Sequence, residues 1–163
     1  MKKLLFVLAI VGLNCNLSSE KAYVNTDELK EQLISDSQSF QLAYISNNYD
    51  QASKFMSNEF ETTVFNSNGT DLIVQTKENI ETSGEGWDFG EFIMSNHMVT
   101  ISTDQKTAVV VFNTDGHINF ENGEQNVPYA TRASQTWVHT TDGWKVMHSH
   151  WSPRIGSSGV PVE

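Results

Sequence analysis

The sequence has little cysteine, proline and positive charge. Cys15 is the single cysteine, so no disulfide forms within the chain, and stability must come from packing. Ten lysine and arginine residues stand against 20 aspartate and glutamate residues, which gives a formal net charge of −10. Nucleic acid is bound through clustered basic side chains, which this sequence lacks. The composition therefore argues against nucleic acid as a partner.

Large apolar side chains are sufficient for a core, with 9 Phe, 4 Trp and 4 Tyr among 163 residues. Only 18% of the residues are charged, which excludes a wholly disordered chain. The length fits one domain, which we predict over residues 25–152. Residues 153–163 are rich in Gly, Ser and Pro and are predicted to be a flexible tail.

The first residues have the pattern of a secretory signal. Lys2 and Lys3 precede an apolar run over residues 4–13, and polar residues follow. Ten residues span about 15 Å as a helix, half of a bilayer's hydrocarbon core, so a permanent transmembrane anchor is the weaker interpretation. We expect a signal peptide over residues 1–19 and export to the periplasm or the extracellular space. Two alternatives stay open for Cys15: lipidation, which would anchor the protein to a membrane, or simple cleavage nearby.

Helical patterns dominate the first third of the predicted domain. Asn25 can cap a helix in which apolar residues recur at three- and four-residue spacing up to a polar break at Asn47. Two shorter helices are predicted over residues 50–56 and 76–81.

From residue 92 onward the period changes from helical to alternating, which is typical of strands. Turn residues, among them Asp142-Gly143, divide this part into four strands of one antiparallel sheet. Because helices come first and strands after, the predicted fold is α+β, with the helices on one face of a curved sheet. The four predicted strands are residues 92–102, 107–120, 129–140 and 144–151.

The last two predicted strands carry motifs of a known family. The sequence reads RASQT at 132–136, DGW at 142–144 and HSHWS at 148–152. This combination resembles the nuclear-transport-factor-2-like superfamily, also called SnoaL-like, and in particular the association domain of calcium/calmodulin-dependent kinase and its bacterial relatives. The resemblance implies a cone, in which the curved antiparallel sheet wraps the long first helix and its open end leaves a pocket. It also implies a homodimer through the convex face of the sheet.

Two histidines on the last predicted strand are the first candidates for chemistry. Strict alternation would put Trp144, Val146, His148 and His150 on one face. Imidazole titrates near neutral pH, so His148 or His150 could act as an acid, a base or a ligand-holding group in the cone. The alternative is that both are hydrogen-bonded sheet residues. We favour this alternative, because the kinase association domains are scaffolds and share the H-x-H pattern.

A second polar group is needed for proton transfer, and Asp115 and Tyr44 are the candidates. Ketosteroid isomerases, which belong to the same superfamily, use an aspartate base where Asn66 stands in this sequence. An amide cannot accept that proton, so isomerase chemistry of that type is disfavoured. Tyr44, Asp115 and His117 leave room for a different acid/base pair.

Candidate ligand-binding residues come from several predicted strands and, for Trp87, from the predicted loop over residues 84–90. Arg132 could bind a carboxylate, or could pair with one of the many surface acids. Trp87 and Trp137 could form aromatic walls for an apolar ligand, or could belong to the core or to an interface. His97 and His117 complete the set. Neutral imidazoles also bind zinc, but the spacing supplies no third ligand, and we expect neither a metal nor another cofactor.

Two functions remain open at this point. The first is an exported, dimeric domain that binds a small, partly apolar molecule or serves as an assembly module, without turnover. The second is a SnoaL-type isomerase, cyclase or hydrolase that uses a pocket histidine and a second polar group for proton transfer. The sequence contains no complete catalytic set, which favours the first.

Overall fold

The computed structural model describes residues 25–80, 87–121, 123–124, 126–154 and 156–157. The predicted signal over residues 1–19, with Cys15, lies outside the described residues, as does most of the predicted tail. Among the described residues, no helix has both the length and the apolar character needed to cross a bilayer.

Helix α1 (Thr26–Ile45) forms where the sequence predicts it. The side chain of Asn25 caps it by accepting a hydrogen bond from the backbone N–H of Asp27 at 3.1 Å. Its buried stripe includes Leu33 and Phe40. The helix ends before Asn47, which has a positive φ of 56°.

The second predicted helix is present as α2 (Tyr49–Ala52) followed by the short helix η1 (Ser53–Phe55). The third is not formed over residues 77–79, which are turns. Here Asn79 Oδ1 accepts a hydrogen bond from the N–H of Thr76 at 2.6 Å, and Thr76 Oγ1 accepts one from the N–H of Glu78. These local side-chain bonds compete with the backbone bonds that a helix would need.

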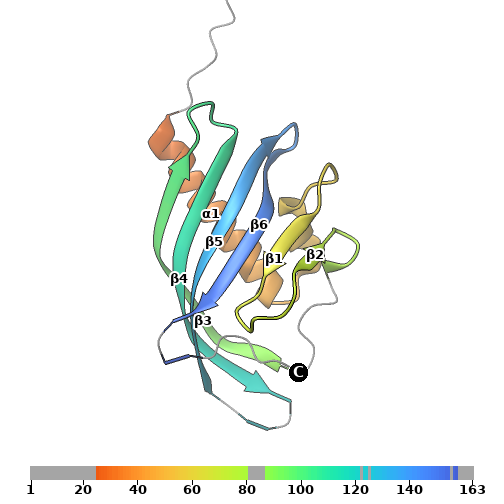
Figure 1. The fold of residues 1–163 in the computed structure, drawn as a ribbon, viewed down its shortest axis with the longest axis vertical. Helices are drawn as coiled ribbons and strands as arrows, with labels where there is room; N and C mark the ends of the chain where they lie inside the picture. The colour runs from red at the N-terminus through yellow and green to blue at the C-terminus, as the bar shows by residue number, and fades with distance from the viewer. Residues whose placement is uncertain (1–24, 81–86, 122, 125, 155, 158–163) are drawn as a thin grey trace, which may run out of the picture.

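The sheet has six strands in the order β2-β1-β6-β5-β4-β3, which confirms the α+β prediction (Figure 1). It is mixed rather than purely antiparallel, because β1 runs parallel to β6. Strands β1 and β2 were not predicted, since they are only 4 and 3 residues long. The strands are β1 (Thr62–Phe65), β2 (Ile73–Gln75), β3 (Trp87–Ile101), β4 (Thr107–Phe120), β5 (Val127–Thr140) and β6 (Gly143–Pro153).

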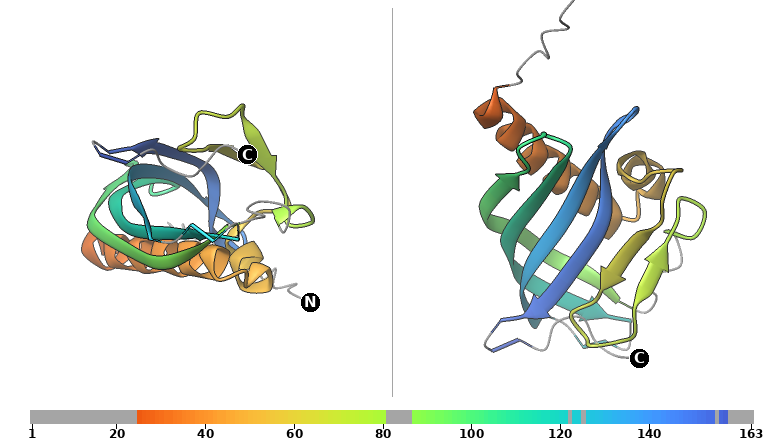
Figure 2. Two further views of the ribbon diagram at one scale, coloured as in Figure 1. Left: turned by 90° about the horizontal axis from the view of Figure 1, so that it is seen from below. Right: turned by 45° about the horizontal axis from the view of Figure 1, so that its top comes forward.

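The sheet curls over α1, as the view from below shows (Figure 2). Trp137 on β5 is fully buried, and its ring meets Phe40 of α1 and Phe55 of η1 edge to face, with centroids 6.3 and 6.1 Å apart. Burying such large rings is the main stabilising contribution of this contact. The concave face of the sheet is therefore filled where the middle of α1 crosses it.

Strand β6 contains a β-bulge at Met147. The residues of β5 and β6 pair in register as far as Trp137 with Val146, but the next pair is Thr136 with His148. Met147 is the extra residue, and it is exposed. After the bulge Ser149 and Trp151 are buried, whereas His150 is exposed. The bulge thus reverses the alternation expected for the end of this strand.

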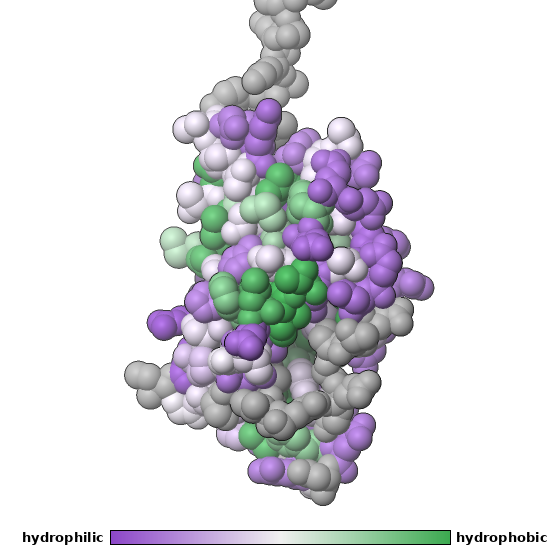
Figure 3. Space-filling view, turned by 45° about the vertical axis from the view of Figure 1, so that its right-hand side comes forward, coloured by the Kyte–Doolittle hydropathy of each residue, from purple (hydrophilic) through white to green (hydrophobic). Residues whose placement is uncertain are grey.

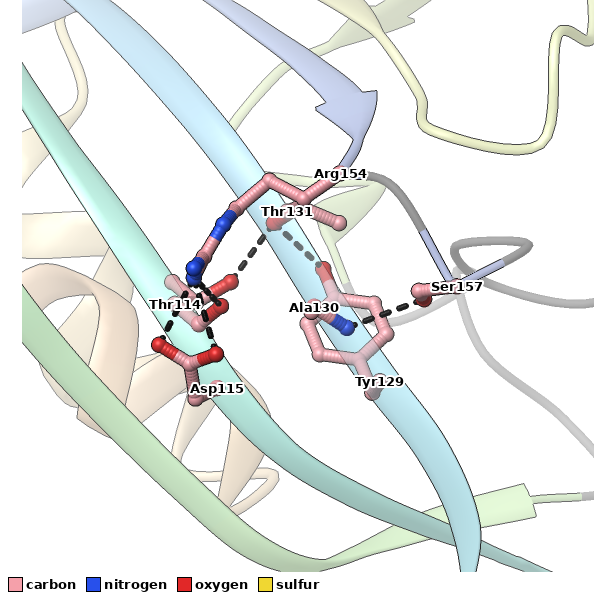
Figure 4. A network of polar contacts seen from close by, with 7 residues as sticks. All are labelled: Thr114, Asp115, Tyr129, Ala130, Thr131, Arg154 and Ser157. Carbon is pink, nitrogen blue, oxygen red and sulfur yellow. Dashed lines mark hydrogen bonds and ion pairs between the residues drawn. The ribbon is translucent and has the colours of Figure 1, made fainter.

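After β6 ends, the chain remains hydrogen-bonded to the first residues of β5. The backbone N–H of Arg154 donates to the carbonyl of Ala130 at 2.9 Å, and the N–H of Ala130 donates to Ser157 Oγ at 2.9 Å. Arg154 also forms an ion pair with Asp115 of β4 at 2.8 Å (Figure 4). Both partners are more than a third exposed, so this pair adds little to stability.

Gly116 allows β3 and β4 to approach closely. A Cβ atom at this position would lie 2.0 Å from the carbonyl oxygen of Glu91 on β3, an overlap that only backbone movement could relieve. We expect Gly116→Ala to lower the free energy of unfolding by about 2 to 3 kcal/mol. Gly69→Ala is the control, because its Cβ would meet nothing within 4 Å. Its φ of 75° predicts a cost of about 1 kcal/mol. Chemical denaturation measures both, and equal costs would contradict the steric account.

Candidate functional site

A cavity of about 90 Å³ lies between the second half of α1 and the sheet. Its walls come from α1, β1, β2, β3, β5 and β6 and from residue 66, next to β1. Pockets for drug-sized ligands are larger, roughly 300 to 1,000 Å³. The volume therefore suits a molecule with few heavy atoms.

One wall of the cavity is an aromatic cluster at the start of β3 and β5. The ring of Phe89 meets those of Trp87, Phe92 and Tyr129 at 5.3, 4.9 and 5.0 Å between centroids. All four residues line the cavity. Edge-to-face contacts of this kind fix the rings in place, so they offer a rigid apolar surface.

The polar groups of the lining are neutral. Gln75 Nε2 donates to the hydroxyl of Tyr44 at 3.1 Å, across the gap between β2 and α1. Gln41, Asn66 and Ser149 also line the cavity. Among the described residues, the lining contains no Asp, Glu, His, Lys or Arg side chain. The remaining lining residues are apolar: Phe40, Ile45, Val64, Ile73 and Trp151.

The hydroxyl of Tyr129 belongs to a buried chain of hydroxyl groups (Figure 4). Thr131 Oγ1 lies 3.3 Å from it and 2.6 Å from Thr114 Oγ1. Burial raises the pKa of Tyr129 above its ordinary value of 10.0, although hydrogen bonds to Thr131, Ser67 and Thr114 oppose the shift. Tyr129 therefore keeps its proton at neutral pH and acts as a neutral group.

His148 and His150 lie on the outer face of the sheet, not in the lining of the cavity. The bulge at Met147 turns them outward, so the face expected from strict alternation is wrong. His148 Nδ1 lies 2.8 Å from Thr63 Oγ1, and the ring of Phe65 contacts both imidazoles edge on. The side chains next to these histidines are those of an exposed sheet surface.

Three further candidates also lie away from the cavity. Asp115 pairs with Arg154. Arg132 is exposed, and its Nε donates to Ser152 Oγ at 2.9 Å. His117 Nδ1 lies 3.9 Å from a carboxylate oxygen of Glu91. The structure does not bring these three residues together with Tyr44.

The other candidates divide between core and cavity. His97 stacks on Phe112 with centroids 5.5 Å apart, and Trp137 is fully buried. Trp87 and Tyr44 line the cavity. The described part of the chain contains no group of three His, Cys, Asp or Glu side chains arranged to hold a metal ion.

Sequence reasoning did not identify Gln41, Gln75, Tyr129 and Ser149 as lining residues. Gln41 is a polar residue at a buried position of α1. A polar residue on the buried face of a helix was the one signal in the sequence that could have identified a lining residue. Gln75 lies on a strand too short to predict. Ser149 faces inward only because of the bulge at Met147, which strict alternation does not reveal.

Comparison with known proteins agrees with this architecture. The family described as the SnoaL-like domain matches residues 37–156. The chain belongs to this family, within the nuclear-transport-factor-2-like superfamily. No curated protein sequence matches the chain.

Solved structures share the fold at low identity. A nuclear-transport-factor-2-like protein from Salmonella enterica serovar Typhimurium has a TM-score of 0.65 and 18% identity, over 81% of this chain and 98% of that protein. The association domain of C. elegans CaMKII has a TM-score of 0.59 and 19% identity, over 77% and 96% of the two chains. A nuclear-transport-factor-2-like protein from Cytophaga hutchinsonii has a TM-score of 0.57 and 17% identity, over 80% and 99%. These likenesses establish the fold alone.

Burial lowers the pKa of His97 below its ordinary value of 6.5. The unfolded chain therefore binds the proton at a higher pH than the folded chain, and the free energy of unfolding falls as the pH drops through 6.5. We expect this fall, measured by chemical denaturation at about pH 7.5 and about pH 5, to be smaller in His97→Gln. A fall of the same size in both proteins would contradict the burial account.

Proposed function

We propose that this SnoaL-like domain binds a small, uncharged, partly apolar molecule in its cavity and does not turn it over. The observation that carries the proposal is the lining, which combines an aromatic wall with neutral polar groups. A charged ligand would lose its hydration there without an opposite charge to replace it. A neutral apolar body would instead gain from burial against Trp87 and Phe92.

The enzymatic alternative needs a pocket histidine and a second titratable group. Proton transfer requires the two groups within hydrogen-bond reach of one substrate. The described lining offers the phenols of Tyr44 and Tyr129, whereas His148 and His150 are on the other side of the sheet. This separation supports binding over catalysis.

Ligand binding predicts a thermal shift. Toluene and benzyl alcohol, each at about ten times its Kd, should raise the melting temperature by a few degrees. Benzoate and benzylamine at the same concentrations should leave the melting temperature unchanged. Binding of the charged probes as tight as that of the neutral ones would contradict the proposal.

Two variants on one strand test the location of binding. Ile73 lines the cavity, while its neighbour Val74 points to the outer face. Ile73→Trp should fill the cavity and abolish the shift, and Val74→Trp should retain it. A shift that survives in a folded Ile73→Trp protein would exclude this cavity as the site.

We also propose that the outer face of the sheet pairs two copies of this chain. Phe65, Met98, Val109 and Val111 are exposed apolar side chains on this face. Figure 3 shows apolar side chains gathered on the side of the sheet that carries β1, β2 and β6, with hydrophilic side chains around them. Exposed apolar patches of this kind mark interaction surfaces.

The charge distribution favours a second copy as the partner. The cross-strand partners of Val109 and Val111 are uncharged: Val109 pairs with Thr136, and Val111 with Ser134. The nearest acid on this face of β4, Asp115, is paired with Arg154. In a chain with a formal charge of −10, two copies can therefore meet here with little repulsion between acids. Such a dimer leaves the cavity, on the concave side, accessible.

Val111→Glu tests the dimer. Two facing carboxylates should dissociate the pair to monomers at tens of micromolar, as measured by sedimentation equilibrium. Leu42→Glu is the control, because Leu42 is an exposed apolar residue on α1 and not on the outer face of the sheet. This variant should remain a dimer. A wild-type protein that is monomeric at this concentration, or a dimeric Val111→Glu variant, would contradict the proposal.

We propose, finally, that the domain acts after export. The support is the sequence alone: the basic residues Lys2 and Lys3, the apolar run over residues 4–13 and Cys15 after it.

A further inference from the structure

Two buried polar side chains line the cavity without a hydrogen-bond partner among the described residues. Gln41 is 8% exposed and Ser149 is 3% exposed. By contrast, the amide of Gln75 donates to Tyr44, and Ser37 donates to Gln135 Oε1 at 2.7 Å.

A further polar atom without a hydrogen-bond partner lies next to Ser149 in the sheet. Ser149 pairs across the strands with Gln135, whose Nε2 is buried and has no partner among the described residues. Gln41 lies one helical turn before Tyr44, on the same face of α1. Buried polar groups in folded proteins nearly always have a partner, since an unmade hydrogen bond costs about 1 to 3 kcal/mol. Groups left open beside a cavity are suited to a ligand.

The chemistry of the two groups defines what they can bind. An amide offers two N–H donors and one carbonyl acceptor, and a hydroxyl offers one donor and an acceptor. Together they match a group that both accepts and donates, such as an alcohol. The described lining contains no cationic side chain that could balance the charge of a carboxylate or a phosphate.

We propose that Gln41 and Ser149 recognise a neutral oxygen group, an alcohol or a carbonyl, on a molecule whose apolar body packs against the aromatic wall. This inference rests on the proposed function and adds the polar determinant of specificity. Catalysis is not required: the two residues hold and orient the ligand.

Benzyl alcohol and toluene form a matched pair of probes, because they differ by one hydroxyl oxygen. In titrations of the whole chain, benzyl alcohol should bind about tenfold tighter than toluene. Gln41→Met and Ser149→Ala should each reduce this preference to about twofold or less while toluene binding persists. Gln32→Met, on the exposed side of α1, and Ser134→Ala, on the outer face of β5, should keep the full preference.

The outcomes separate the two proposals. Binding of both probes with no preference for the alcohol, or a full preference in both cavity variants, overturns the role of Gln41 and Ser149 and leaves the proposed function intact. Failure of every neutral probe to bind overturns the proposed function as well.

A measurement on the wild-type protein covers the case in which a variant does not fold. The side-chain amide resonances of Gln41 in a ¹H–¹⁵N spectrum should move with benzyl alcohol and stay nearly unchanged with toluene at equal occupancy. Equal movement with both probes, or none with either while they bind, overturns the inference.

Discussion

One extra residue in β6 determines which side chains face the cavity. The bulge at Met147 leaves His148 on the outer face and returns Ser149 to the inner one. With strict alternation, the imidazoles of His148 and His150 would enter the cone. With the bulge, a hydroxyl and an indole take their place. The neutral character of the cavity therefore depends on a local change in strand register.

The two faces of the sheet consequently have different chemistry. On the concave side, the contact of Phe40 with Trp137 fills the region under α1, and the cavity remains next to it. On the convex side, short apolar side chains such as Val109 and Val111 are exposed, and Asp115 of the same strand is paired with Arg154. A binding cavity and an assembly surface can thus share one sheet without competing for residues.

The sequence predicted the fold well and the site poorly, for a physical reason. The capped helix after Asn25, the bounds of β4 and the Asp142-Gly143 turn are set by local signals. The prediction for β3 was wrong at its start, which lies at Trp87 and not at residue 92. The lining depends on which way each strand residue points, and a bulge changes this without a marker in the sequence. Tyr44 and Trp87 were identified because aromatic residues stand out. Gln75 was missed because β2 gives no periodic signal.

Backbone amide shifts during titration with benzyl alcohol test the central claim most directly, because they report both faces of the sheet at once. The largest shifts are expected at Tyr44, Gln75 and the inward residues of β6 after the bulge. Shifts centred instead on His148, His150 and Phe65 would place binding on the outer face. That result would contradict the account of a neutral cavity as the functional site.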